Sequence, residues 1–260
     1  MVVLFVGLAS AGTGGTPAPT SAASTKAASS LGVLDSIVRD AIHDGQIPGA
    51  VVLVGHNGQV VYRKAFGNRA LEPRREPMTV DTIFDVASLT KVVATTTAVM
   101  QLVQKGEVRL NDPVTKYLPE FAENGKEDIT VRNLLTHFSG LREDVDLLPA
   151  WQGRDAALRL AFAEKPAYSP GSRFLYSDTN FIALGALVER VTGTALDAYC
   201  TKKIFTPLRM THTRFLPPPA WRRKIAPTEY DEQGKMMRGV VHDPRAVSYT
   251  HLTLPTKRIV

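Results

Sequence analysis

A serine and a lysine lie three residues apart in the run Ser88-Leu89-Thr90-Lys91. An apolar stripe at helical spacing surrounds them and predicts one helix over residues 86–104, which Gly106 ends. Helical positions three apart share a face, with Cβ atoms roughly 5–6 Å apart, so the Lys91 amine can reach the Ser88 hydroxyl. A serine hydroxyl becomes a strong nucleophile when a base takes its proton. We expect burial at a domain interface to lower the pKa of Lys91 and make its amine that base.

The alternative for this pair is an exposed serine and lysine on an ordinary amphipathic helix, because short patterns of this kind are common. A second motif favours the catalytic interpretation. The run Tyr176-Ser177-Asp178 directly precedes an apolar segment that predicts a helix over residues 178–192. The alternative for Tyr176 is an aromatic residue that merely packs ahead of the helix, and geometry decides such a role.

Together the two motifs resemble those of the serine β-lactamase and penicillin-binding-protein superfamily. The resemblance is closest to class C β-lactamases and to the related esterases and D-amino-acid peptidases. It extends in order over residues 34–246, through segments 83–91, 129–137 and 176–178. The resemblance implies that Ser88 is the acylated nucleophile, that Lys91 accepts its proton, and that Tyr176 carries a proton to the leaving group.

Asp178 lies where many β-lactamases have asparagine, and the resemblance makes it a substrate-binding residue. An asparagine amide can donate a hydrogen bond to a substrate carbonyl, whereas an ionised aspartate can only accept. This departure argues against β-lactam hydrolysis more than against acyl transfer in general.

The resemblance also implies a third motif, Lys-Thr-Gly or His-x-Gly, on a strand that supplies one N–H of the oxyanion hole. No such motif follows Asp178 in this sequence. Loss of one oxyanion-hole donor typically slows catalysis about a hundredfold to a thousandfold.

The resemblance and the pattern of elements predict an α/β (α+β) fold, with an antiparallel sheet flanked by helices and a helical domain. A helix is expected over 34–44, then strands at 50–55 and 60–65 on either side of Asn57-Gly58, a strong hairpin signal. Further helices are expected near 130–137, 154–163 and 194–204. The ligand cleft should lie between helices and sheet, and we expect the C-terminal strands of the sheet to be missing.

Three regions are expected along the chain. Residues 1–30 combine an apolar run, a small-residue pattern that resembles a secretory cleavage site, and a leader rich in Gly, Ser, Thr and Pro, so we expect a periplasmic or secreted protein. Residues 31–246 form the hydrolase domain, which we expect to be incomplete. Residues 247–260 back-translate into a sequence that resembles a transposase adapter, so we interpret them as a non-native tail; a genuine edge strand is the alternative.

The composition is that of a globular protein, with 44% hydrophobic residues and a formal net charge of +6. The positive charges form no block that would indicate nucleic-acid binding. No metal-ligand spacing or phosphate loop is present, so we expect no cofactor and no metal. No segment is long enough for a stable membrane span. The expected partner is a small-molecule or peptide substrate, such as a cell-wall component. The single cysteine, Cys200, is expected to be a small buried hydrophobe.

Other polar residues make weaker candidates. His137 and Ser139 could form a base and a nucleophile, but Gly140 marks a helix end there and a structural role is the better interpretation. Glu229, His242 and Asp243 could line a substrate entrance, but a solvated loop is the better interpretation.

The sequence therefore predicts a serine hydrolase that opens an amide, ester or β-lactam through an acyl-enzyme at Ser88. Three alternatives remain open: a penicillin-binding D-alanyl peptidase or carboxylesterase of the same fold, a relative that recognises penicillin without turnover, and an inactive fragment. They differ in whether and how fast the acyl group is released.

Overall fold

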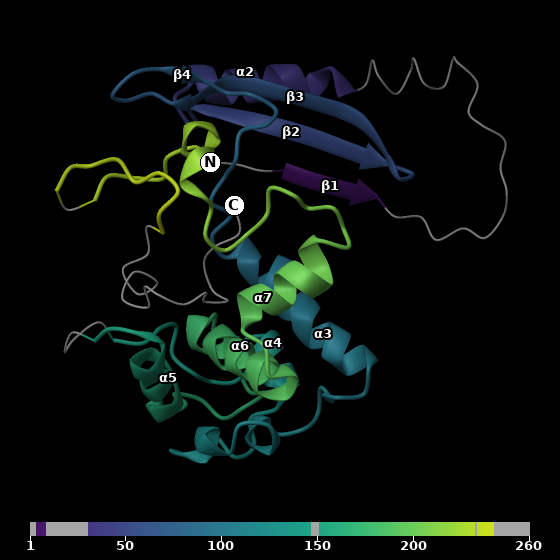
Figure 1. Ribbon diagram of the computed structural model, residues 1–260, viewed down its shortest axis with the longest axis vertical. Helices are drawn as coiled ribbons and strands as arrows, with labels where there is room; N and C mark the ends of the chain where they lie inside the picture. The colour runs from purple at the N-terminus through teal and green to yellow at the C-terminus, as the bar shows by residue number, and fades with distance from the viewer. Residues whose placement is uncertain (1–3, 9–30, 147–150, 232, 242–260) are drawn as a thin grey trace, which may run out of the picture. The chain divides into compact units, whose positions relative to one another are not determined.

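The computed structural model describes residues 4–8, 31–146, 151–231 and 233–241 (Figure 1). The chain divides into two compact units, Met1–Ile83 and Phe84–Val260. The mixture of helix and strand that the sequence predicts is confirmed. The expected non-native tail, His242 and Asp243 lie outside the described residues, as does the leader apart from residues 4–8.

The described residues of the first unit form one helix and a four-stranded sheet of order β1-β2-β3-β4. Its elements are β1 (Leu4–Leu8), α2 (Val33–His43), β2 (Gly49–His56), β3 (Gln59–Ala70) and β4 (Glu76–Pro77). The predicted hairpin is confirmed: β2 and β3 are antiparallel, with His56 paired to Gln59. Asn57 and Gly58 have φ angles of 50° and 73°, the two positive values that the tightest hairpin turn requires.

The sheet is not wholly antiparallel, because β1 pairs with β2 in parallel register. The apolar run that we interpreted as part of a leader thus adds a strand to the open edge of β2, where unpaired backbone groups accept a further strand. Helix α2 contacts β2 and β3. Its Asp35 accepts hydrogen bonds from Tyr62 and Lys64 of β3, which fixes the helix to the sheet.

The second unit is mainly helical. Its α-helices are α3 (Thr97–Gln104), α4 (Val131–Leu135), α5 (Arg154–Ala163), α6 (Asp178–Thr192) and α7 (Leu196–Cys200). A π-helical turn at Lys91–Thr96 directly precedes α3, and another at Thr201–Phe205 directly follows α7. Short 3₁₀ helices lie at Val114–Lys116, Pro119–Ala122 and Pro219–Lys224. The described part of the chain contains no helix long and apolar enough to span a membrane.

Helix α6 lies at the centre of this unit and contacts α3, α4, α5 and α7 (Figure 1). Every residue from Asp178 to Val188 is buried, so this part of the helix is covered on all sides. Gly193 ends it with φ of 63°, the left-handed conformation that glycine adopts without strain. Cys200 of α7 is also buried, as expected, and burial raises the pKa of its thiol to about 12.

The ends of α5 and α6 agree with the sequence prediction, but three other helices differ from it. The predicted helix over 86–104 begins only after Ser88 and is π-helical from Lys91 to Thr96. The helix expected over 130–137 is shorter, because Thr130 caps its start and His137, with φ of 61°, leaves the helical conformation. The helix expected over 194–204 is divided between α7 and a π-helical turn.

Candidate active site

The turn before the predicted nucleophile has an unusual backbone. Ala87 has φ of 45°, which is costly for a residue with a side chain and typical of functional sites. Oδ1 of buried Asp85 accepts a hydrogen bond of 2.9 Å from the Ala87 N–H and stabilises this turn. The N–H of Lys91 then donates to the Ser88 carbonyl, closing a 3₁₀-type turn. Side chains three apart are eclipsed in such a turn, so Ser88 and Lys91 are better aligned than in the predicted α-helix.

The three predicted catalytic side chains meet at one atom. Oγ of Ser88 accepts a hydrogen bond of 3.1 Å from Nζ of Lys91. It also lies 2.9 Å from the Tyr176 hydroxyl, which donates to it. Lys91 is 3% exposed, whereas Tyr176 is 41% exposed, so the cluster has a buried amine and an accessible phenol. The structure thus brings together the base, the nucleophile and the proton carrier that the two motifs predicted.

Asp178 contacts the lysine of this cluster. Its Oδ1 lies 2.7 Å from Nζ of Lys91, and both side chains are almost completely buried. Asp178 is the first residue of α6, where the N-terminal end of the helix favours a negative charge. Nζ of Lys91 also lies 5.1 Å from the Tyr176 ring centroid and 5.7 Å from that of Phe181. The resemblance predicted Asp178 as a substrate-binding residue; the structure adds a direct contact with Lys91 that the sequence did not indicate.

His137 contacts the Tyr176 turn in three ways. Its carbonyl accepts a hydrogen bond of 2.9 Å from the Leu175 N–H. Its ring nitrogen Nδ1 accepts one of 3.0 Å from the Ser177 N–H. Its ring stacks on that of Tyr176, with centroids 4.5 Å apart and planes at 27°. These contacts join residues 38 to 40 positions apart in the sequence, so no local pattern could have revealed them.

Ser139 lies near this group but does not act with His137 as a base and nucleophile pair. It is 0% exposed, and its hydroxyl donates a hydrogen bond of 2.6 Å to Oδ1 of Asn180. The structural interpretation of Ser139 therefore agrees with its surroundings. Glu229, the other weak candidate among the described residues, is exposed.

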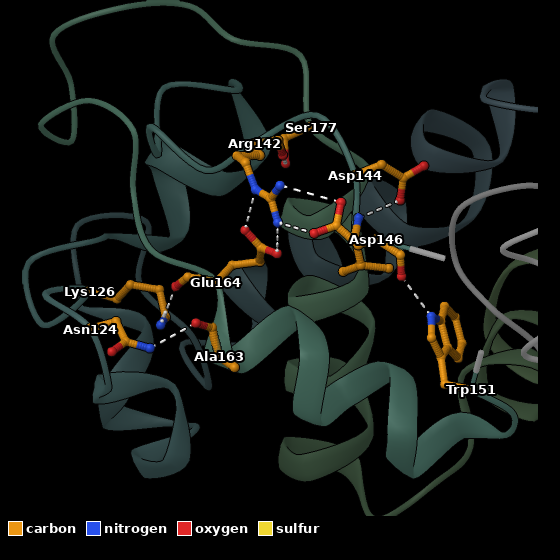
Figure 2. A network of polar contacts seen from close by, with 10 residues as sticks. Asn124, Lys126, Arg142, Asp144, Asp146, Trp151, Ala163, Glu164 and Ser177 are labelled. Carbon is orange, nitrogen blue, oxygen red and sulfur yellow. Dashed lines mark hydrogen bonds and ion pairs between the residues drawn. The ribbon is translucent and has the colours of Figure 1, made fainter. Parts of the chain in front are cut away.

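A polar network supports the site from the side of α5 (Figure 2). The Arg142 guanidinium forms two hydrogen bonds to the Glu164 carboxylate, of 2.8 and 2.6 Å. These carboxylate contacts raise the pKa of Arg142. The Arg142 carbonyl accepts a hydrogen bond of 2.6 Å from the Ser177 hydroxyl, and the next carbonyl, of Glu143, accepts one of 2.7 Å from the Asp178 N–H. The segment that carries Arg142 thus holds the backbone between Tyr176 and Asp178.

Lys126 closes the same network below Arg142 (Figure 2). Its side chain is fully buried, and its amine donates to the carbonyls of Phe162 and Glu164, both at 2.7 Å, and to that of Glu123. Burial lowers the pKa of this amine. Because Phe162 and Glu164 lie at the C-terminal end of α5, Lys126 caps that helix and fixes the start of the segment that bears Glu164.

A large hollow in the second unit, with a volume of about 960 Å³, lies along α5, α6 and the 3₁₀ helix at Pro119–Ala122. None of Ser88, Lys91, Tyr176 and Asp178 lines it. Among the described residues, no group of three or more His, Cys, Asp or Glu side chains could hold a metal ion.

The chain is similar to proteins of a known family. The profile of the family described as Beta-lactamase matches residues 34–250. A putative D-alanyl-D-alanine carboxypeptidase of Escherichia coli O157:H7 is 33% identical over 229 residues, which make up 80% of this chain and 52% of the relative. The chain therefore spans about half the length of that relative.

Solved structures of other proteins share the fold. EstCE1, described as a hydrolase with promiscuous acyltransferase activity, matches with a TM-score of 0.69 and 26% identity, over 88% of this chain and 65% of its own. A class C β-lactamase matches with a TM-score of 0.71 and 24% identity, over 89% of this chain and 62% of its own, which concerns the fold alone. Because the family match covers most of its length, the chain belongs to the Beta-lactamase family, within the superfamily of serine β-lactamases and penicillin-binding proteins.

Proposed function

We propose that this protein is a serine hydrolase that acts on an amide, an ester or a β-lactam through an acyl-enzyme at Ser88. The observation that carries the proposal is the convergence of the Lys91 amine and the Tyr176 hydroxyl on the Ser88 oxygen, at 3.1 and 2.9 Å. A nucleophile within hydrogen-bond reach of a base, which is held in turn by a third group, is the arrangement that activates a serine.

Each proton has a partner in this arrangement. A proton of Lys91 can first pass to Asp178 at 2.7 Å, which leaves a neutral amine that takes the Ser88 proton as the Ser88 oxygen attacks the acyl carbon. The buried pair then carries one positive charge until Lys91 gives this proton on, which matters because an isolated charge is costly there. Tyr176 gives its proton to the leaving group and regains one from Lys91. Water then attacks the acyl carbon, and the Ser88 oxygen recovers its proton as the acid is released.

The acyl substrate is proposed from the relatives. The carboxypeptidase is named for a D-alanyl-D-alanine peptide, and EstCE1 is described as a hydrolase with acyltransferase activity. We favour a small ester over a β-lactam, because the Asp178 carboxylate accepts hydrogen bonds and cannot donate one to an amide carbonyl. A cell-wall peptide is the second candidate, and the name of the carboxypeptidase relative supports it. A relative that is acylated by penicillin without turnover is the alternative.

One assay series tests the activity. Purified protein and its Ser88→Ala variant are incubated with p-nitrophenyl acetate, with nitrocefin, and with a peptide ending in D-Ala-D-Ala, and product release is followed together with intact protein mass. Continuous release that the variant lacks supports hydrolysis of that substrate. An acyl adduct on Ser88 without further release indicates the penicillin-recognising alternative. Full turnover by the Ser88→Ala protein would contradict the proposed mechanism.

We also propose that the protein is exported. The apolar start and the small-residue pattern in the first residues support this. Cleavage there would remove β1 from the sheet edge of β2. N-terminal sequencing of the protein recovered from the medium or periplasm of an expression host tests the proposal, and retention of the uncleaved chain in the cytoplasm argues against it.

A further inference from the structure

The catalytic phenol is held by a residue outside both sequence motifs. His137 contacts Leu175 through its carbonyl, Tyr176 through its ring, and Ser177 through Nδ1. His137 therefore contacts the residues before and after Tyr176 as well as the Tyr176 ring, in the turn that presents the phenol to Ser88. A side chain held in this way loses little freedom when it must align with a reacting atom.

The hydrogen-bond directions around Nδ1 of His137 determine which form of the ring is present. The Ser139 hydroxyl accepts a hydrogen bond of 3.1 Å from the Leu141 N–H and donates to Oδ1 of Asn180. The amide of Asn180 is thereby oriented with its NH₂ group towards His137, where Nδ2 lies 3.4 Å from Nδ1. With the Ser177 N–H at 3.0 Å, two donors point at Nδ1. This ring nitrogen is an acceptor, so the imidazole is neutral and carries its proton on Nε2.

The burial of the ring also opposes a positive charge on it. Its aromatic neighbours are Phe174, Tyr176 and Phe181, with centroids 5.9, 4.5 and 5.3 Å away. Burial lowers the pKa of His137 below its ordinary value of 6.5, and the nearby Lys91 ammonium lowers it further, whereas the Asp178 carboxylate acts in the opposite direction. The neutral form therefore persists to a lower pH than in an ordinary histidine.

We propose that His137 is the positioning residue for Tyr176: while neutral it holds the phenol against Ser88, and protonation at Nδ1 breaks the bond to Ser177 and releases the phenol. The inference rests on the proposed acyl transfer at Ser88. It makes the rate of acylation depend on the charge of a residue that does not touch the substrate.

Two substitutions of His137 distinguish the effect of its hydrogen-bond acceptor from the effect of its backbone conformation. His137 has φ of 61°, which glycine and asparagine tolerate better than other residues. His137→Asn keeps an acceptor oxygen close to the place of Nδ1, and His137→Gly removes it. We expect His137→Gly to slow acylation of Ser88 by p-nitrophenyl acetate about a hundredfold, the usual cost of a misplacement of about 1 Å, and His137→Asn to retain a rate within about tenfold of the unchanged protein. Equal rates in the two variants overturn the proposal.

The dependence on pH provides a readout that a purely structural role would not change. The rate of Ser88 acylation in the unchanged protein should decrease as the pH falls through the pKa of His137. In His137→Asn this part of the acid limb should disappear, because the amide does not titrate. His56→Asn, a substitution of an exposed histidine at the end of β2, is the matched control and should keep the original limb. An unchanged acid limb in His137→Asn contradicts the inference.

A nuclear magnetic resonance titration separates this inference from the proposed function. Chemical shifts of ¹⁵N-labelled histidine should show the His137 proton on Nε2 near neutral pH, and the Ser177 amide resonance should move as the ring titrates. If no probe acylates Ser88 although these shifts occur, the proposed hydrolase activity is wrong while the contact is real. A proton on Nδ1 near neutral pH, or a Ser177 amide that does not respond, overturns the positioning role directly.

Discussion

The amine of Lys91 lies 2.7 Å from Oδ1 of Asp178, and neither side chain is more than a tenth exposed. The base of the candidate site is thus half of a buried ion pair. Attraction within such a pair offsets the large cost of taking two charges out of water only when both partners are present. Asp178, from the second motif, therefore stabilises the charge of Lys91, from the first motif.

Removal of the carboxylate should destabilise the protein. Asp178→Ala leaves the Lys91 charge buried without a counter-charge, and we expect a loss of about 3–5 kcal/mol in the free energy of unfolding. Asp178→Asn keeps the size and one acceptor oxygen, so its loss should be smaller. Asp155→Ala, which removes an 82% exposed carboxylate of α5, is the control and should change stability by at most about 0.5 kcal/mol. Urea unfolding measures all three, and equal losses for Asp178→Ala and Asp155→Ala would show that the pair has no effect.

The hydroxyl of Tyr176 should matter more than its ring. Tyr176→Phe keeps the stacking on His137 but removes the proton donor 2.9 Å from Ser88. We expect acylation by p-nitrophenyl acetate to slow about a hundredfold to ten-thousandfold, the usual contribution of general acid–base catalysis, with little change in KM. Tyr168→Phe, at an exposed tyrosine of the same unit, serves as the control. A Tyr176→Phe protein that acylates at the original rate would assign the proton transfer to another group.

Lys126, whose buried amine contacts the C-terminal end of α5, should contribute to stability and take no part in catalysis. Lys126→Met removes the donor that three backbone carbonyls share, and each unsatisfied buried carbonyl costs about 1–3 kcal/mol. We therefore expect a large decrease in the urea midpoint. Lys165→Met, at an exposed lysine close by in sequence, should leave the midpoint nearly unchanged. The prediction is wrong if the two variants unfold at the same urea concentration.

The paired contact between Arg142 and Glu164 should influence Ser88 from a distance. Arg142→Lys keeps the charge but cannot form the two parallel hydrogen bonds to the carboxylate. The Arg142 carbonyl, which accepts from the Ser177 hydroxyl, would then be held less firmly. We expect slower acylation, about tenfold or less, with unchanged substrate preference. An unaltered rate would show that the neighbouring Glu143 carbonyl alone is sufficient to hold the turn.

Stability should also depend on pH through His137. Its pKa is lowered in the folded protein, mainly by burial, whereas in the unfolded chain it returns to about its ordinary value of 6.5. The unfolded state therefore binds the proton more tightly. The contribution of His137 to stability is complete above pH 6.5 and is lost as the pH falls towards the folded-state pKa. Comparison of thermal unfolding in the unchanged protein and in His137→Asn between pH 4 and pH 8 checks the prediction, since the variant should lose this part of the acid destabilisation.

The elements that the sequence predicted best are those whose turns or ends are marked by a short local motif. Asn57-Gly58 determined the hairpin, and Gly193 determined the end of α6. The π-helical turn at Lys91–Thr96 and the parallel β1 were not predicted, because hydrogen-bond register and strand partner do not follow from the spacing of apolar residues.

The same distinction holds in the site. Ser88, Lys91 and Tyr176 belong to short motifs, and the structure brings them together as predicted. The contact of Asp178 with Lys91 depends on how α6 packs against the π-helical turn at Lys91–Thr96, and that of His137 with Tyr176 depends on how α4 and α6 pack. Only the folded chain shows them.

The contact between Ser88 and Tyr176 joins residues 88 positions apart in the chain. A nascent polypeptide that ends before Tyr176 lacks the phenol, and a misfolded one cannot bring it to the serine. The fraction of chains that a covalent acyl probe labels should therefore equal the fraction of folded molecules, in which Tyr176 contacts Ser88. Refolding yield, chaperone dependence and the damage done by any substitution could all be followed in crude extract by this single chemical reaction.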